Sequence, residues 1–369
     1  MKKVLLVNKY YHPDIGGVET IVKQHAEMLK DEHDVTVLCV HKRKSAKTKK
    51  LSINGVHVIR CSSFGTFFSM PLSISFFYYY CKLYIQNEVI INHAPFPLAD
   101  IAYSLISYIK KRKLYIFWHS DIVKQKIFKK ILSPFTSRTC NQAFRILTTS
   151  EALAKNSKDL VKYQHKVEVV PLSVDCISIS KYSSNNITQK RWDFIFFGRL
   201  CYYKGVEVLI DAIHILKDKG VEPKIIIAGD GELKNYIVEN ITTKKLKKVH
   251  FVPRFLTEEE KYEFLSSSKC FLFPSVANSE AFGITQLEAM ALSVPVINTN
   301  LPTGVPSVSK HNETGLTVQP GSSKELAEAM LFMMNNPSQL SQFSEKCFPR
   351  VITSFDDKII KNKLMSFIE

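Results

Sequence analysis

Two glutamates and the turn between them form the stretch of this chain best suited to chemistry. Glu280 precedes a turn made by Phe282, Gly283 and Ile284, which starts a predicted helix, and Glu288 lies about one turn into that helix. Backbone N–H groups at a helix start bind phosphate oxygens, while carboxylates accept hydrogen bonds from sugar hydroxyls. The stretch therefore indicates a site for a sugar joined to phosphate. A capping role for Glu280 and an ordinary helix position for Glu288 remain open from these residues alone.

Two cations follow a predicted strand earlier in the same half of the chain. Gly198 and Arg199 leave that strand, and Lys204 and Gly205 enter the next helix. The planar guanidinium of Arg199 and the point charge of Lys204 could together hold a diphosphate. A further glycine-rich turn, at residues 229–232, is interpreted mainly as a tight connection.

The first half of the chain contributes a glycine pair and a histidine. Gly16 and Gly17 lie between the first predicted strand and a helix, where they let an anion or a sugar oxygen approach the backbone. They do not form the Gly-x-Gly-x-x-Gly pattern of dinucleotide binding, so a purely structural turn remains open. His119 follows a predicted buried strand. From this position alone, contact with substrate and packing in the core are equally open.

The positive charge is concentrated in the first half of the chain. The net charge is +16, and residues 1–190 hold 29 Lys or Arg against 13 Asp or Glu, whereas the remainder is balanced. The densest basic region includes a predicted helix at 122–132 that carries Lys124, Lys126, Lys129 and Lys130. Such a face is solvated by default, and docking to phosphate or anionic lipid is the functional alternative.

An aromatic run at residues 64–85 raises the question of a membrane. Pro71, Lys82 and several serines interrupt it, so it falls short of the roughly 18 apolar residues that a spanning helix needs. A helix packed into the core and an aromatic surface that touches lipid both remain open.

Metal and disulfide chemistry have little support in the sequence. The 8 cysteines form no Cys-x-x-Cys pair and several lie in apolar runs, which is typical of buried thiols in a reducing cytosol. No Asp-x-Asp occurs, so we expect no metal ion and no cofactor. The apolar start at residues 4–7 is too short for a signal peptide and favours a cytoplasmic protein.

Short apolar strands alternate with amphipathic helices along nearly the whole chain. This alternation indicates an α/β fold with parallel sheets covered on both faces. A polar stretch rich in Ser and Asn, at residues 178–190, separates two such series. We therefore predict two Rossmann-like domains, at 1–180 and 191–350, with their parallel sheets facing a central ligand cleft. The predicted strands are 4–7, 35–40, 56–60, 89–92, 114–118, 145–148 and 167–171, then 194–197, 224–228, 249–252, 270–273, 294–298 and 315–318.

Taken together, these stretches resemble the family-4 retaining glycosyltransferases, which have the GT-B fold of two Rossmann-like domains. The most specific match is the family's Glu-x₇-Glu signature, met by Glu280 and Glu288. The resemblance runs over nearly the full length, in the family's order and spacing. Its further landmarks are Gly16-Gly17-Val18-Glu19, Gly198-Arg199, Lys204-Gly205, Gly229-Asp230-Gly231 and Thr314-Gly315.

The resemblance implies a role for each candidate residue. The second domain would bind a nucleotide-diphosphate sugar and the first would bind the acceptor, with residues 351–369 crossing back to the first domain. The diphosphate would contact Arg199, Lys204 and the turn of Phe282, Gly283 and Ile284, and its far side would contact Gly16 and Gly17. The ribose would contact Glu288. The hydroxyls of the donor sugar would contact Glu280, and its C6 hydroxyl would contact His119.

The resemblance also implies the reaction and its partners. A hexose would move with retention of configuration, and cations and a helix dipole would stabilise the leaving diphosphate without a metal. Residues 118–125 are similar to bacterial O-antigen and capsule transferases, several of which use GDP-mannose, and UDP-sugars are close rivals. The acceptor would be a saccharide on a lipid diphosphate, which places the enzyme peripherally on the cytoplasmic side of the inner membrane.

The sequence features suit two other functions less well. A UDP-sugar 2-epimerase shares the same fold but needs acid and base residues on both faces of the sugar. A basic nucleic-acid-binding protein would suit the positive first half, but Glu280 and Glu288 would repel a phosphate backbone.

Overall fold

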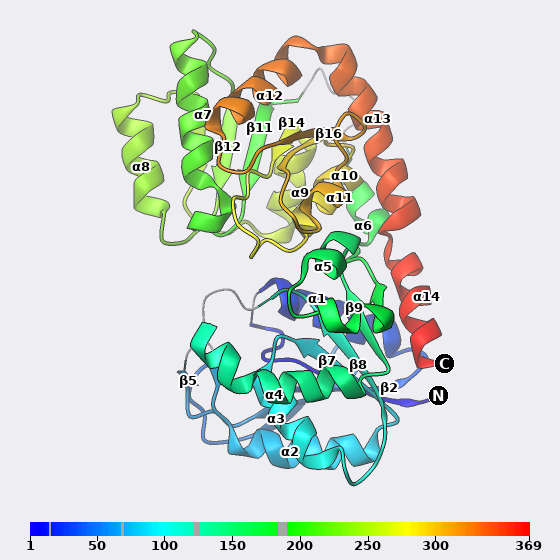
Figure 1. Ribbon diagram of the computed structural model, residues 1–369. Helices are drawn as coiled ribbons and strands as arrows, with labels where there is room; N and C mark the ends of the chain where they lie inside the picture. Colours follow the sequence, from blue (N-terminus) through cyan, green and yellow to red (C-terminus); the bar gives the residue numbers. More distant parts are fainter. Residues whose placement is uncertain (15, 68–69, 122–125, 184–189) are drawn as a thin grey trace. The chain divides into compact units, whose positions relative to one another are not determined.

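The computed structural model describes residues 1–14, 16–67, 70–121, 126–183 and 190–369, so Lys124 lies outside the described residues (Figure 1). The chain divides into two compact units, one made of residues 1–171 and 360–369 and the other of residues 172–359. Each unit has its own mainly parallel sheet flanked by helices. The predicted class, an α/β fold with two Rossmann-like domains, is confirmed.

The boundary between the units falls earlier in the chain than the polar stretch at 178–190 suggests. Val174 forms a bridge with Asp356, and helix α6 (Cys176–Ser180) packs on helix α10 (Ile284–Ala291). These contacts place residues 172–180 in the second unit rather than at the end of the first. At the other end of the chain, residues 360–369 are part of the first unit.

The sheet of the first unit has the strand order β10-β9-β8-β7-β1-β2-β4-β3, and every neighbouring pair except β3 and β4 is parallel. Its strands are β1 (Lys3–Val7), β2 (Asp34–Val40), β3 (Lys49–Ile53), β4 (Val56–Cys61), β7 (Val89–Ala94), β8 (Lys113–Trp118), β9 (Arg145–Thr148) and β10 (Val167–Val169). A separate antiparallel pair joins β5 (Thr66–Phe67) to β6 (Met70–Pro71). Strand β3 was not predicted, because its residues are mostly exposed and polar.

The helices of the first unit are α1 (Gly17–Leu29), α2 (Ile74–Gln86), α3 (Pro97–Ile106), α4 (Lys126–Gln142), α5 (Glu151–Asn156), the 3₁₀ helix η1 (Val161–Lys166) and most of α14 (Asp357–Ile368). Helix α2 comes from the aromatic run and buries Phe76, Tyr80 and Tyr84 in the core, as a core-packed helix would. Helix α4 continues ten residues beyond its predicted end at 132, through Pro134. Among the helices that the structure describes, none is long and apolar enough to cross a membrane.

The second unit has a fully parallel sheet of order β13-β12-β11-β14-β15-β16. Its strands are β11 (Trp192–Phe197), β12 (Ile225–Ala228), β13 (Val249–Val252), β14 (Ser268–Leu272), β15 (Val296–Thr299) and β16 (Gly315–Val318). Besides α6 and α10, its helices are η3 (Tyr202–Lys204), α7 (Val206–Asp218), α8 (Lys234–Thr243), α9 (Glu258–Ser266), α11 (Val305–Val308), α12 (Ser323–Asn335) and α13 (Pro337–Ser354). Helices α7 and α12 pack against each other over one face of this sheet (Figure 1).

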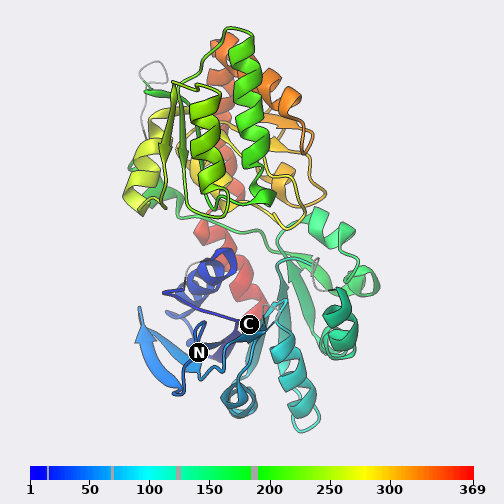
Figure 2. The same ribbon diagram turned by 90° about the vertical axis from the view of Figure 1, so that its left-hand side faces the viewer.

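The two ends of the described chain meet in the first unit. The Lys2 ammonium donates to the carbonyl oxygens of Ile368 and Glu369, each at 2.8 Å. The Tyr115 hydroxyl donates to the carbonyl of Phe367. Figure 2 shows the two termini close together beside this sheet. The last helix is therefore an integral part of the first unit.

Candidate functional site

The strand order of the second sheet indicates where a ligand can bind at the carboxyl ends of its strands. Chain connections leave β11 toward β12 on one side, while β14 lies on the other side of β11. Such a reversal leaves room for a ligand beyond the carboxyl ends of the two strands. Arg199 and Lys204 follow β11, and Glu280 follows β14. The topology thus brings the predicted cations and the first glutamate to one end of the sheet.

Gly205 sets the position of Lys204. It has a φ of 69°, in the left-handed region, and a Cβ at this position would lie 1.9 Å from the carbonyl oxygen of Pro274. A side chain is therefore excluded, and the turn packs directly on the segment that follows β14. The backbone N–H of Val276 donates to the carbonyl of Tyr203 at 2.9 Å and ties the two segments together.

Lys204 and Glu280 form a largely buried ion pair. The Nζ of Lys204 lies 2.6 Å from Oε2 of Glu280, and their side chains are only 16% and 12% exposed. The hydroxyl of Ser275 donates to the same carboxylate oxygen at 3.2 Å. The ammonium also lies 5.1 Å from the ring centroid of Phe273. A buried carboxylate and a buried ammonium need such partners, because each alone would lose its hydration without compensation.

The start of helix α10 is rigidly held. Gly283 has a φ of 90°, and a Cβ there would lie 2.6 Å from the ring of Phe273. The side-chain amide of Gln286 donates to the carbonyl of Phe282 at 3.1 Å and accepts from Asn298 at 2.9 Å. The first N–H groups of a helix have no partner inside that helix. The helix begins four residues after Glu280, so a fixed helix N-terminus is close in sequence to the ion pair.

Glu288, within α10, forms a second ion pair. Its Oε1 lies 2.5 Å from Nζ of Lys261, which comes from helix α9, and the two side chains are 11% and 19% exposed. Burial, the largest cause, and the negative charge of Glu288 raise the pKa of the neighbouring Tyr262 hydroxyl. Lys261 was not among the predicted site residues, because it lies 27 positions from Glu288.

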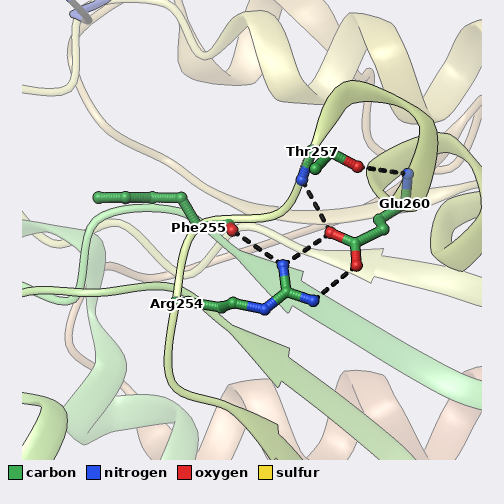
Figure 3. Close-up of polar contacts among 4 residues, drawn as sticks. All are labelled: Arg254, Phe255, Thr257 and Glu260. Carbon is green, nitrogen blue, oxygen red and sulfur yellow. Dashed lines mark hydrogen bonds and ion pairs between the residues drawn. The ribbon is translucent and has the colours of Figure 1, made fainter.

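A network at the start of α9 holds the helix that carries Lys261 (Figure 3). Thr257 accepts from the backbone N–H of Glu260, whose carboxylate accepts in return from the backbone N–H of Thr257. The guanidinium of Arg254 donates to both carboxylate oxygens, at 2.7 and 2.6 Å. The hydrogen bonds from Arg254, above all, lower the pKa of Glu260 to about 2. The network fixes where α9 begins and thus the direction in which Lys261 leaves it.

Arg199 lies at the end of β11 with its side chain exposed. Among the described residues it has no ion-pair partner, which leaves its five N–H donors for a ligand or for solvent. Its charge and that of Glu280 both act on the Tyr203 hydroxyl, whose pKa is raised mainly by burial. Arg199 therefore lies near the Lys204–Glu280 pair without binding to it.

The glycine-rich turn at residues 229–231 supports the loop that carries Arg199. The N–H of Leu200 donates to the carbonyl of Asp230, and the N–H of Leu233 donates to the carbonyl of Leu200, each at 3.0 Å. The carboxylate of Asp230 accepts from the N–H of Gly231. These bonds fit the interpretation of this turn as a tight connection.

Gly16 and Gly17 lie where helix α1 begins, beyond the end of β1 in the first unit. A Cβ on Gly16 would lie 2.1 Å from the carboxylate of Glu19, whereas a Cβ on Gly17 would meet no atom within 4 Å. The structure thus leaves open space at Gly17 and crowds Gly16 with the side chain of Glu19.

His119 lies in a buried cluster of aromatic rings. Its Nε2 is 2.9 Å from Nδ1 of His93, and its ring stacks on those of His93 and Phe117. Only 4% of His119 is exposed. Burial lowers the pKa values of His119 and His25 to about 3. Both imidazoles are therefore neutral near pH 7, and His119 has one ring nitrogen committed to His93.

Two of the four predicted basic residues of the first unit, Lys129 and Lys130, have described side chains. Lys129 is paired with Asp159 at 2.7 Å, whereas Lys130 is exposed. Lys126 is the first residue of α4, and Lys124 lies outside the described residues. Within the described ranges, no group of three or more His, Cys, Asp or Glu side chains could hold a metal ion.

Two family models match adjacent parts of the chain. The model described as Glycosyltransferase Family 4 matches residues 15–177, and the model described as Glycosyl transferases group 1 matches residues 180–347. The first covers residues 15–171 of the first unit and runs six residues beyond its boundary, and the second contains the Lys204–Glu280 and Lys261–Glu288 ion pairs.

Two curated relatives match this chain over nearly their whole length. The chain is 27% identical to the D-rhamnosyltransferase WbpZ of Pseudomonas aeruginosa, with 95% of this chain and 91% of the relative covered. It is 28% identical to the O-antigen chain mannosyltransferase C of Escherichia coli, with 93% and 91% covered.

Solved structures show the same GT-B fold. A sucrose-phosphate synthase from Thermosynechococcus elongatus has a TM-score of 0.80 at 16% identity, over 100% of this chain and 98% of its own. Anabaena HepE in complex with UDP has a TM-score of 0.75 at 18% identity, over 100% and 99%. With both halves matched by glycosyltransferase models, the chain belongs to family 4 of the glycosyltransferases, whose second domain is the group 1 type, and the protein is an enzyme of that family.

Proposed function

We propose that this enzyme transfers a hexose, with retention of configuration, from a nucleotide-diphosphate sugar to a saccharide carried on a lipid diphosphate. The observation that carries the proposal is the Lys204–Glu280 ion pair beside the fixed start of α10. The names of the relatives, a D-rhamnosyltransferase and an O-antigen chain mannosyltransferase, support a role in bacterial surface polysaccharide synthesis.

The donor's diphosphate would bind at the positive end of this site. Lys204 and Arg199 supply the cations, and the N–H groups of Phe282, Gly283 and Ile284 supply dipoles directed at the phosphate oxygens. An ammonium has three N–H donors, so Lys204 can keep its bond to Glu280 while it binds a phosphate oxygen.

The two carboxylates would bind hydroxyls of the donor. Glu280 is placed to accept from the sugar, and Glu288 from the ribose, while Lys261 holds Glu288 at 2.5 Å. In this proposal His119 meets the sugar's C6 hydroxyl through the ring nitrogen not bound to His93, and Gly16 and Gly17 line the far side of the diphosphate.

The bond changes follow from this placement. The anomeric carbon loses its bond to the phosphate oxygen and gains one to the acceptor oxygen on the same face, and the acceptor's proton passes to the departing phosphate. Charge grows on the leaving diphosphate, where the two cations and the dipole of α10 stabilise it. The proposed reaction needs no metal ion and no cofactor.

The acceptor and location belong to the same proposal. A lipid-linked acceptor lies at a membrane surface, and the basic first half of the chain suits peripheral binding to the cytoplasmic face of the inner membrane. Lys124, Lys126, Lys129 and Lys130 are the proposed contacts, although Lys129 would first have to leave Asp159.

The test is a panel of nucleotide sugars, with GDP-mannose, UDP-glucose and UDP-N-acetylglucosamine as the first members. We expect one of them to raise the melting temperature by several degrees, with an undiminished rise in EDTA. Donor incubated without acceptor would yield an epimer if the protein were a 2-epimerase. A strict need for Mg²⁺ or Mn²⁺ would contradict the metal-free mechanism, and a panel without any binder would contradict the function.

A further inference from the structure

The first unit contains a cavity of about 550 Å³ beside helices α3, α4 and η1. This volume lies within the range of roughly 300–1,000 Å³ that small-molecule sites occupy. None of the candidate donor-binding residues lines the cavity. The cavity is therefore separate from the candidate donor-binding residues.

The wall of the cavity is largely apolar. It includes Phe96, the residue directly before α3, and Trp118, the last residue of β8, and both are buried. The remaining apolar lining includes Phe128, Leu132, Val161 and Tyr163. An aromatic and aliphatic surface of this kind binds hydrocarbon better than it binds sugar, because it offers few hydrogen bonds.

Cations surround this apolar wall. Lys9, Lys129, Lys158 and Lys162 all line the cavity, against two acidic residues, Asp100 and Asp159. Lys158 and Lys162 are exposed, whereas Lys129 is paired with Asp159 at 2.7 Å. The lining thus combines hydrocarbon surface with an excess of positive charge, which is complementary to an anionic amphiphile.

The cavity lies at the end of the sheet where substrates bind in this class of fold. Ala94 and Trp118 line it from the carboxyl ends of β7 and β8. The strand order reverses between β1 and β7, and Gly16 follows β1. A head group held at the cavity's edge would therefore lie on the functional edge of the sheet.

Helix α4 has a second apolar row besides the one that lines the cavity. Ile127, Ile131 and Phe135 recur every four residues and are 80%, 63% and 36% exposed. Phe128 and Leu132 occupy the adjacent row, which faces the cavity. A helix that covers a water-facing protein surface needs one apolar row, whereas a helix that also meets an apolar phase needs two.

We infer that the cavity binds the hydrocarbon chain of the acceptor's carrier lipid, with the lipid's diphosphate on the exposed lining lysines, Lys158 and Lys162. The inference rests on the proposed function and gives the lipid part of the acceptor a site in the first unit. The exposed row of α4 would meet the membrane surface from which the chain enters.

Farnesyl diphosphate is a suitable probe, and its binding can be followed by calorimetry on the unaltered chain. We expect it to bind at least tenfold more tightly than inorganic pyrophosphate, which lacks the chain, and than farnesol, which lacks the charge. Equal binding of pyrophosphate would overturn the apolar part of the inference, and equal binding of farnesol would overturn the role of the lysines.

A matched pair of serine variants tests the location. Ser133 lines the cavity and Ser366 does not; both are exposed, lie on helices of the first unit, and donate to the carbonyl three residues earlier, at 2.9 and 2.8 Å. We expect Ser133→Phe to weaken farnesyl diphosphate binding at least tenfold and Ser366→Phe to change it less than twofold. Equal affinities in the two variants would place the lipid elsewhere.

A charge variant tests the inference independently, in case Ser133→Phe does not fold. Lys162 is exposed, so Lys162→Glu should fold normally and weaken farnesyl diphosphate binding about three- to tenfold while leaving farnesol unchanged. Unaltered farnesyl diphosphate affinity in this variant would overturn the assignment of the head group.

The nucleotide-sugar panel separates this inference from the proposed function. If a nucleotide sugar binds but farnesyl diphosphate does not, the lipid site is wrong and the transferase function stands. If farnesyl diphosphate binds and no nucleotide sugar does, the proposed function fails, and with it the assignment of the lipid as acceptor.

Discussion

The two units bury ionisable groups in opposite ways. In the second unit the buried carboxylates of Glu280 and Glu288 each hold a lysine, at 2.6 and 2.5 Å. In the first unit the buried imidazoles of His25, His93 and His119 gather around one another, and burial lowers the pKa of each.

This difference decides which kind of ligand group the buried side chains of each unit can stabilise. Charges kept ionised and paired inside a protein are already desolvated, so they can stabilise new charge on a ligand with little rearrangement. Neutral rings in an apolar setting cannot do this, but they shape a surface for uncharged groups. If the proposed function holds, the ion pairs of the second unit suit a charged leaving group, whereas the histidine cluster of the first unit suits uncharged groups of the substrate.

The largest expected effect comes from breaking the first ion pair. Lys204→Met should lower transfer by about 100- to 1,000-fold, because a cation next to the leaving group is lost. It should also cost about 3 kcal/mol of stability, since the buried Glu280 loses its charge partner and keeps only the hydrogen bond from Ser275. Steady-state kinetics and thermal unfolding measure the two effects.

A double variant separates stability from catalysis. Lys204→Met combined with Glu280→Gln removes the unpaired charge, so it should regain stability but not activity. Lys234→Ala is the control, because Lys234 forms an exposed pair with Asp230 at 3.6 Å, and its activity should stay within twofold. Recovery of activity in the double variant would assign the pair a purely structural role.

The second ion pair should act on binding rather than on the chemical step. Glu288→Gln should raise KM for the donor about tenfold and change kcat less, because a hydrogen bond to ribose is made equally in ground and transition states. The variant should also lose the preference for a ribonucleoside diphosphate over its 2′-deoxy form, measured by calorimetry. Glu313→Gln, in an exposed pair with Lys310, is the control.

The histidine cluster should make stability depend on pH. Unfolded histidine takes up a proton near pH 6.5, whereas folded His25 and His119 do so only near pH 3. Between these values the unfolded chain binds more protons, so stability falls as the pH is lowered. Asp100 opposes this loss in part, because burial raises its pKa to about 6.

His119→Gln should remove part of the acid sensitivity. Melting temperatures between pH 7 and pH 4.5 should fall less than in the parent chain, by an amount equivalent to about 2 kcal/mol. An unchanged pH profile would mean that His119 titrates normally and is not enclosed as described.

The smallest expected effect lies at the start of α9. Thr257→Ala removes the capping hydroxyl drawn in Figure 3 and should cost about 1 kcal/mol, with activity within about twofold. Thr243→Ala, at the far end of α8, should cost less. A large loss of activity in Thr257→Ala would show that the position of Lys261 depends strongly on the cap.

Much of the fold could be predicted because apolar periodicity marks buried strands directly. Strands such as Phe194 to Phe197 and Ile225 to Ala228 are buried along their whole length, and the alternation with helices then fixes a parallel sheet. Strand β3 was not predicted because its side chains are exposed. The placement of residues 172–180 in the second unit is not visible in the sequence, because α6 packs on a helix about a hundred residues away.

The site was predictable only where one segment holds its residues. Glu280, Gly283 and Glu288 are visible as a pattern because one turn and one helix carry them. Lys261 and the cavity were not, since their partners come together only when distant elements pack. His119 was identified by position, but its bond to His93 depends on the register of β7 with β8.

The contact between Lys2 and the last two residues has a consequence for biosynthesis. The first unit is discontinuous, because its final helix is translated only after the whole second unit. The second unit can acquire its core while the first still lacks a helix. Truncation before residue 360 would therefore remove a helix from the unit whose other elements are made first.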